Sequence, residues 1–295
     1  MSDPRPVGVF DSGVGGLTVL SEILRRLPAE PTIYLGDNAR APYGVRDTDE
    51  IERFSSEGLA ELAARDVKAI VVACNTSSAV ALEQLREAFD VPILGVVRPG
   101  ASAAALATRN GRIGVIATPA TIRSRAYFGA IKDENPALHV YEQPTPELVP
   151  LVEAGHLDGP AVEASVRRSV APLVGEATRR PGRSAGMPFG RLPDRPIDTL
   201  LLGCTHYPLL RPTIAAVVGP AVAVVDAAAA TASSLAELLA VNGLQAPASA
   251  TPAAHEQLTT GDVASFERTA RLMFGDGFPS VASVEIGAGL AVAEA

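Results

Sequence analysis

Several residue types that mark particular protein classes are scarce in this sequence. Its 295 residues include two cysteines, Cys74 and Cys204, so a disulfide-rich framework is excluded and a single structural disulfide is the weaker interpretation. Neither cysteine has a second ligand at the short spacing of zinc sites, so we expect no metal. Only two of the 25 basic residues are lysines and the net charge is −8, which gives no basic surface for a nucleic acid.

Long apolar stretches are also missing. No run reaches the length of a membrane-spanning helix, and the first residues lack the basic-then-apolar pattern of a signal peptide. Apolar residues make up 47% of the chain and charged residues 20%, proportions that are typical of a well-buried globular fold. We therefore expect a cytoplasmic protein with no membrane or nucleic-acid partner, in which both thiols stay reduced.

Strands and helices are predicted to alternate along the whole chain. Short apolar runs bounded by turn residues indicate buried strands, and apolar residues three or four positions apart indicate helices between them. The predicted strands cover residues 7–10, 32–35, 70–73, 92–97, 113–117, 138–141, 199–202, 222–225, 257–260 and 281–286. This alternation predicts parallel sheets with helices on both faces.

The second half of the chain repeats the pattern of the first. Residues 113–118 resemble residues 7–12, because an apolar strand ends in a small polar residue in both. Each half then carries one cysteine directly after a later strand. Two similar halves are the economical interpretation, and chance similarity of short apolar strands is the alternative.

From this repetition we expect an α/β fold of two similar domains, with parallel sheets flanked by helices and the active site between the domains. The first domain is predicted to contain residues 1–98 and 210–295, and the second residues 99–209. Pro99-Gly100 is predicted to break the chain where the second domain begins. Residues 178–196 are rich in Arg, Pro and Gly and lack an apolar period, which indicates a surface insertion.

Polar residues follow four of the predicted strands. Asp11, Cys74, Thr118 and Cys204 each stand where an apolar run ends. Ligands of parallel α/β folds bind beyond the carboxyl ends of the strands, so we expect the site there. The glycine-rich turn after Asp11 lacks the spacing of a dinucleotide-binding loop, but its backbone N–H groups suit a carboxylate.

Two thiols in matching contexts suggest one site built from two halves. Each precedes a predicted helix, whose N-terminus lowers the pKa of a thiol by stabilising the thiolate. A lone cysteine is usually buried and inert, and a nucleophilic Cys204 with His206 as its base is a hydrolase-like alternative that leaves Cys74 without a role. Thiols on opposite faces of one carbon explain both residues. One removes a proton and the other returns one from the far side, which inverts a stereocentre.

Four motifs, in this order, resemble those of bacterial glutamate racemases. They are Gly-Val-Phe-Asp-Ser-Gly-Val-Gly-Gly-Leu at 8–17, Pro-Tyr-Gly at 42–44, Ala-Cys-Asn-Thr at 73–76 and Leu-Gly-Cys-Thr-His-Tyr-Pro at 202–208. The resemblance runs from about residue 7 to residue 286. It implies a cofactor-independent interconversion of L- and D-glutamate that supplies D-glutamate for peptidoglycan. It also implies two similar α/β domains with the site between them, usually in a homodimer.

The resemblance further implies roles for individual residues. Cys74 would take the proton from D-glutamate and Cys204 from L-glutamate, with Asp11 and His206 assisting them. The amino and carboxylate groups of the substrate would be held by Asp11, Ser12, Tyr43, Gly44, Asn75, Thr76, Thr205 and His206. Glu153 resembles a family position near the site, although a solvated helix residue is an equal expectation.

Other functions share parts of this pattern. Aspartate racemases, hydantoin racemases and maleate isomerases use the same two-cysteine plan, and His206-Tyr207-Pro208 favours glutamate. A pyridoxal-dependent racemase needs a lysine at the site. Lys68 opens its strand at the end away from Cys74 and Lys132 ends a helix, so neither fits. A regulatory protein is a further class, since some family members are reported to inhibit DNA gyrase, but we identify no added basic or apolar surface for a partner.

We expect activity without metal or pyridoxal phosphate, because the sequence offers no metal-ligand set and no suitably placed lysine. Dialysis against a chelator should leave the racemisation rate of glutamate, followed by circular dichroism, unchanged, and the absorption spectrum should show no cofactor band. Activity that is lost on dialysis and returns with added metal or pyridoxal phosphate would contradict the acid–base interpretation.

Overall fold

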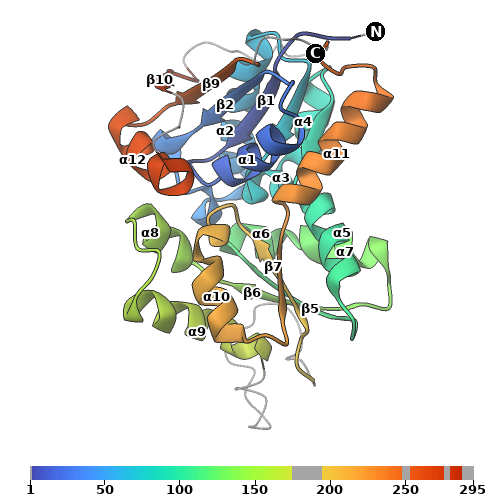
Figure 1. Cartoon of the computed structure of the whole chain (residues 1–295), viewed down its shortest axis with the longest axis vertical. Helices are drawn as coiled ribbons and strands as arrows, with labels where there is room; N and C mark the ends of the chain where they lie inside the picture. The colour runs from blue at the N-terminus through green and yellow to red at the C-terminus, as the bar shows by residue number, and fades with distance from the viewer. Residues whose placement is uncertain (1, 175–194, 248–252, 276–279, 288–295) are drawn as a thin grey trace.

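A computed structural model describes residues 2–174, 195–247, 253–275 and 280–287 (Figure 1). Its elements gather around two sheets that lie one above the other along the long axis of the molecule. No helix in the described ranges is both long and apolar enough to cross a membrane. The insertion predicted at 178–196 falls, except for its last two residues, outside the described residues.

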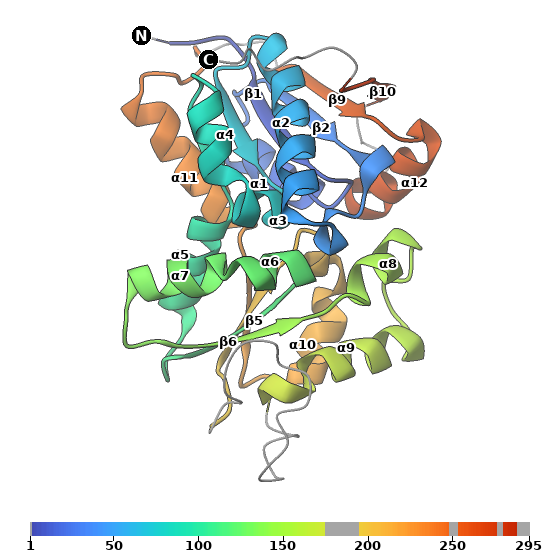
Figure 2. The ribbon, with the colours of Figure 1, turned by 180° about the vertical axis from the view of Figure 1, so that it is seen from behind.

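The first sheet has six parallel strands in the order β10-β9-β2-β1-β3-β4. Val9 and Phe10 belong to different core clusters, because successive side chains of a strand point to opposite faces. The strands are β1 (Val7–Asp11), β2 (Thr32–Gly36), β3 (Ala69–Val72), β4 (Ile93–Gly95), β9 (His255–Thr259) and β10 (Val281–Ser283). Helices α1 (Leu17–Arg26), α11 (Ala228–Val241) and α12 (Val263–Phe274) cover one face, and α2 (Thr48–Ala64) and α4 (Leu82–Ala88) cover the other (Figures 1 and 2).

The second sheet has four parallel strands in the order β6-β5-β7-β8. They are β5 (Arg112–Ala117), β6 (His139–Pro144), β7 (Thr199–Gly203) and β8 (Ala223–Asp226). One face packs against α8 (Leu148–Glu153), α9 (Pro160–Val174) and α10 (Arg211–Val218), and the other against α5 (Val97–Ala107) and α7 (Ala126–Glu134). The central strands read as continuous apolar runs because both of their faces are covered. The predicted α/β fold with parallel sheets flanked by helices is confirmed.

The chain crosses between the two domains twice. It leaves the first sheet through α5, whose first turn contains Pro99 and Gly100 in place of the predicted break. Proline is tolerated there because the first N–H groups of a helix have no acceptor within the helix. The return also differs from the prediction, which put it at residue 210. Since β8 pairs with β7 and α10 packs against α9, residues 211–226 lie with the second sheet. The two crossings lie side by side, because α5 contacts α11.

A buried ion pair lies at the amino end of β3, opposite the end that leads to Cys74. Lys68 Nζ is 2.5 Å from Glu30 Oε2 and donates to the carbonyl oxygen of Asp3 at 2.7 Å. Both charged side chains are almost fully buried. Two buried charges are tolerated when each compensates the other, so removal of one partner is costly. The pair fixes the amino ends of β2 and β3 relative to each other.

We expect Glu30→Ala to lower the free energy of unfolding by roughly 3 kcal/mol, because it leaves the Lys68 ammonium buried without its counter-charge. Urea denaturation followed by circular dichroism measures the loss. Glu22→Ala is the matched control, since Glu22 pairs with Arg25 at the surface and its removal should cost less than about 1 kcal/mol. Equal effects of the two substitutions would contradict the role of the buried pair.

Candidate active site

The carboxyl ends of the two sheets face each other across a narrow cavity. In the first domain β3 leads to Cys74, and in the second β7 leads to Cys204. The cavity leaves about 20 Å³ for a water-sized molecule, so an amino acid does not fit in the arrangement shown. The lining consists of Ser12, Pro42, Tyr43, Gly44, Cys74, Asn75, Thr76, Thr118, Val149, Glu153, Cys204, Thr205 and His206.

Asp11 is the one residue predicted for the site that does not line this cavity. It is fully buried behind the lining, where its carboxylate accepts hydrogen bonds from Gly13 N–H at 2.9 Å and the Thr205 hydroxyl at 3.2 Å. The glycine-rich turn thus directs an N–H group at the protein's own carboxylate. Burial raises the pKa of Asp11 to about 6, although the charge of His206 and these hydrogen bonds lower it. Asp11 is therefore mostly ionised at neutral pH.

Cys74 stands at the start of α3 (Asn75–Val80), in the first domain. Its sulfur accepts a hydrogen bond from Ser77 N–H at 3.4 Å, and its thiol donates to Ser12 Oγ at 3.5 Å. Burial raises the pKa of Cys74 to about 11, and the negative charge of Asp11 adds to this, against the hydrogen bonds of Ser12 and Ser77. The prediction of a lowered thiol pKa is wrong for Cys74, because α3 is short and desolvation outweighs its N-terminal field.

Cys204 has the opposite electrostatic surroundings. Its sulfur lies 3.7 Å from Nδ1 of His206, whose Nε2 lies 3.4 Å from the Glu153 carboxylate. Burial lowers the pKa of His206, but the Cys204 sulfur and the Glu153 carboxylate raise it to about 10 overall. The imidazole is therefore protonated at neutral pH. One thiol thus faces a carboxylate and the other an imidazolium.

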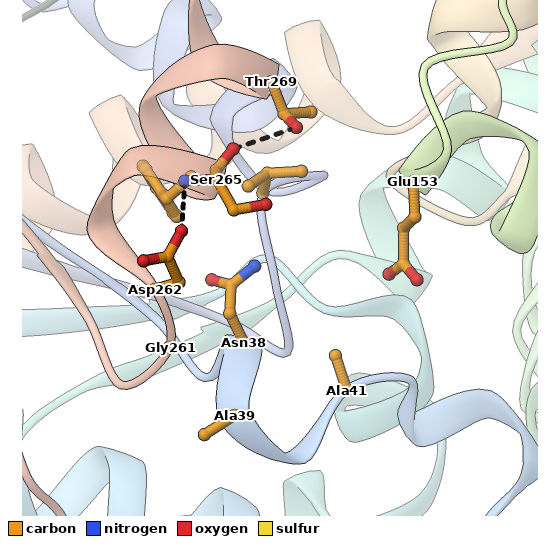
Figure 3. A pocket seen from close by; sticks show the side chains of 10 residues that line it. Asn38, Ala39, Ala41, Glu153, Gly261, Asp262, Ser265 and Thr269 are labelled. Atoms are coloured by element: carbon orange, nitrogen blue, oxygen red, sulfur yellow. Dashed lines mark hydrogen bonds between the residues drawn. The ribbon is translucent and has the colours of Figure 1, made fainter.

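Glu153 lines the site, although its side chain is partly exposed to solvent. It ends α8, its side chain is 34% exposed, and it lines a second, larger cavity of about 340 Å³ as well as the first. Figure 3 shows its carboxylate on the opposite side of this larger cavity from Asn38 and Ala41. Asn38 belongs to η1 (Asn38–Arg40) of the first domain. Glu153 therefore contacts the His206 side chain and also faces the larger cavity.

The turn after β1 packs directly against the residues that follow Cys204. A Cβ atom added to Gly15 would stand 2.5 Å from Thr205 Oγ1 and 2.7 Å from His206 Nδ1, so only glycine allows this approach. The hydroxyl of Thr18 donates to the Thr205 carbonyl oxygen at 3.4 Å. These contacts join the two domains next to Cys204.

Thr118, which the sequence places at a strand end but to which no catalytic or substrate-binding role was assigned, also lines the cavity. Its hydroxyl lies 3.0 Å from that of Thr76 in the other domain and 3.0 Å from that of Thr121. The signal was present, because Thr118 ends a strand at the same sheet edge as Cys204. A second residue without an assigned role, buried Asp37, accepts a hydrogen bond from the Tyr43 hydroxyl. Nothing in the sequence pairs these two side chains.

Residues 7–235 match the protein family described as Asp/Glu/Hydantoin racemase. The chain belongs to this family. A relative named glutamate racemase from Shouchella clausii is 42% identical over 282 residues, 96% of this chain and 95% of its own.

Solved structures of family members agree with the fold. Glutamate racemase isoform RacE1 of Bacillus anthracis has a TM-score of 0.85 and 40% identity, covering 95% of this chain and 97% of its own. Glutamate racemase of Francisella tularensis, solved in complex with D-glutamate, has a TM-score of 0.82 and 32% identity, covering 96% of this chain and 98% of its own. The match therefore extends over both domains of this racemase-family chain.

For this family member we expect Glu153→Gln to move the alkaline limb of the kcat/KM–pH profile to lower pH. The substitution removes one of the two groups that raise the pKa of His206, so the imidazolium loses its proton at lower pH. The profile of kcat/KM reports groups of the free enzyme, and its apparent pKa values belong to the coupled groups. Glu147→Gln is the control, because Glu147 pairs with Arg168 at the surface and should leave the profile unchanged. Identical profiles for the two variants would contradict the assignment.

Proposed function

We propose that the protein interconverts L- and D-glutamate by a two-cysteine mechanism. The observation that carries the proposal is the pair of free, buried thiols that line one cavity from different domains. Two relatives that the chain covers almost completely support glutamate as the substrate, because both are named glutamate racemases. The Francisella relative, described with D-glutamate bound, supports an amino-acid site in the same fold.

Each turnover moves one proton off the substrate and one onto it. From D- to L-glutamate, the Cys74 thiolate takes the α-proton, the carbon–hydrogen bond breaks, and the electron pair stays on the carbon as a carbanion. The Cys204 thiol then gives its proton to the opposite face, which leaves a Cys204 thiolate and a Cys74 thiol. The reverse reaction exchanges these roles, so acid–base chemistry alone accounts for the inversion.

The neighbouring charges support this division of work. With a pKa of about 11, Cys74 is a thiol before substrate binds. A substrate ammonium close to Asp11 would offset the carboxylate charge that disfavours the thiolate, so Asp11 would assist Cys74 by attracting the ammonium. The imidazolium of His206 would stabilise Cys204 whenever that residue is a thiolate.

Hydroxyl and amide groups around the thiols suit the carboxylates of glutamate. We assign substrate contacts to the lining residues predicted from the resemblance and add Thr118, because its hydroxyl lies beside that of Thr76. The lining residues predicted from the resemblance are Ser12, Tyr43, Gly44, Asn75, Thr76, Thr205 and His206. Asp11, which lies behind the lining and accepts a hydrogen bond from Thr205, contributes through its charge.

Three further parts of the proposal rest on the family resemblance alone. D-Glutamate made by this protein would serve peptidoglycan synthesis, the protein would act in the cytoplasm, and it would form a homodimer. Sedimentation of the purified protein measures the last of these. Aspartate and hydantoin racemisation are the competing activities, and rates measured with glutamate, aspartate and a hydantoin under the same conditions distinguish them.

We expect the two thiols to be separable by isotope exchange in heavy water. Cys204 then carries a deuteron from solvent, so L-glutamate formed from D-glutamate should contain deuterium from the first turnover. Unreacted D-glutamate should gain little, because return from Cys74 restores its own proton. Mass spectrometry of both enantiomers at early times measures this. Product that keeps the substrate's proton would contradict two separate acid–base groups.

Single-cysteine variants provide matched controls. Neither Cys74→Ala nor Cys204→Ala should racemise glutamate, because one face then lacks its acid or base. Cys204→Ala should still exchange the α-hydrogen of D-glutamate slowly, and Cys74→Ala that of L-glutamate. If either variant keeps full racemisation, or if exchange follows the other enantiomer, the assignment of the thiols is wrong.

A further inference from the structure

A tyrosine of the second domain reaches into the first and binds one of the residues that line the cavity. The hydroxyl of Tyr127, on α7, donates a hydrogen bond to the side-chain oxygen of Asn75, which begins α3. The tyrosine is fully buried. Burial first, and then the charges of Cys204 and Asp226, raise the pKa of Tyr127 far above the neutral range, so the hydroxyl keeps its proton.

The bond restricts what Asn75 offers to the cavity. An asparagine side chain has one oxygen, which accepts hydrogen bonds, and one NH₂ group, which donates them. Tyr127 occupies the oxygen, so the NH₂ group is left for other partners. Asn75 is 4% exposed and lines the same cavity as the two thiols. An ionised carboxylate can only accept hydrogen bonds, so a site that holds it needs donors.

The residue before Cys204 makes room for this tyrosine. A Cβ atom on Gly203 would stand 3.0 Å from Cε2 of Tyr127 and 2.9 Å from the Cβ of Ala117. A larger residue would displace the Tyr127 ring or move the strand that delivers Cys204. The glycine of the 202–208 motif therefore has a packing reason that involves Tyr127.

We propose that Tyr127 is a positioning residue that fixes the amide of Asn75 so that its NH₂ group donates to a substrate carboxylate. The proposal rests on the proposed role of Asn75 in glutamate binding. Because the bond joins the two domains, the amide is fixed only while they are closed. An unbound amide could turn its oxygen toward the carboxylate, where the two acceptors repel.

We expect Tyr127→Phe, which keeps the ring and removes the hydroxyl, to raise KM for both enantiomers by about 3- to 10-fold, the effect of one lost hydrogen bond. The value of kcat should change less than about twofold, since no proton-transfer group is altered. Because the two enantiomers are equally stable, kcat/KM must fall by the same factor in both directions. Tyr207→Phe is the control. It removes another buried hydroxyl, which bonds to Thr145 inside the second domain, and should leave KM unchanged.

A double-substitution cycle tests whether Tyr127 acts through Asn75. Asn75→Ala should raise KM on its own, and Tyr127→Phe should then cause no further increase. Asn75→Asp keeps an acceptor for Tyr127 but removes the donor, so its KM should exceed that of Tyr127→Phe. Unfolding temperatures of all variants show whether the fold is kept.

The outcomes separate the two proposals. If Asn75→Ala raises KM and Tyr127→Phe does not, the positioning role is overturned while the site assignment stands. If Asn75→Ala leaves KM unchanged, the contact between Asn75 and substrate is wrong, and the positioning role falls with it. If Tyr127→Phe and Asn75→Ala raise KM independently and additively, Tyr127 does not act through Asn75. If Tyr207→Phe raises KM as much as Tyr127→Phe does, the effect is a general loosening of the second domain.

Discussion

A hydrogen bond from Thr205 to Asp11 joins the carboxyl ends of the two sheets, and the arrangement of the site depends on this contact. Asp11 belongs to the first domain and is fully buried, yet one of its hydrogen bonds comes from Thr205 of the second. An ionised carboxylate without such donors would be too costly to bury. The closed position of the domains and the charge of Asp11 are therefore linked.

The two cysteines occupy similar positions on the backbone but have neighbours of opposite charge. Each cysteine follows the strand that is second from one edge of a parallel sheet and precedes a short helical segment. Beside Cys74 stands a carboxylate, which opposes a second negative charge, whereas beside Cys204 stands an imidazolium supported by Glu153. A repeated fold thus supplies similar positions for the two thiols, and a few different neighbours give them opposite electrostatic surroundings.

The sequence was a good guide to whatever depends on local pattern. Strands buried on both faces appear as plain apolar runs, so the positions of Asp11, Cys74 and Cys204 at strand ends could be predicted. Features that depend on contacts between distant residues could not. The raised pKa of Cys74 follows from burial next to Asp11, and the bond between Tyr127 and Asn75 crosses from one domain to the other. The return of the chain after β8 was missed because an apolar strand does not reveal which sheet it joins.

The paired crossings at α5 and α11 have a mechanical consequence. Both connections lie on one side of the molecule, whereas α8 and α12 lie on the other (Figures 1 and 2). Two adjacent tethers resist sliding and stretching but permit rotation about a line through them. Under such a rotation displacement grows with distance from the axis. The gap between Glu153 and Asn38 would thus widen most, while atoms close to the tethers would hardly move, so the larger cavity would open on the side away from α5 and α11.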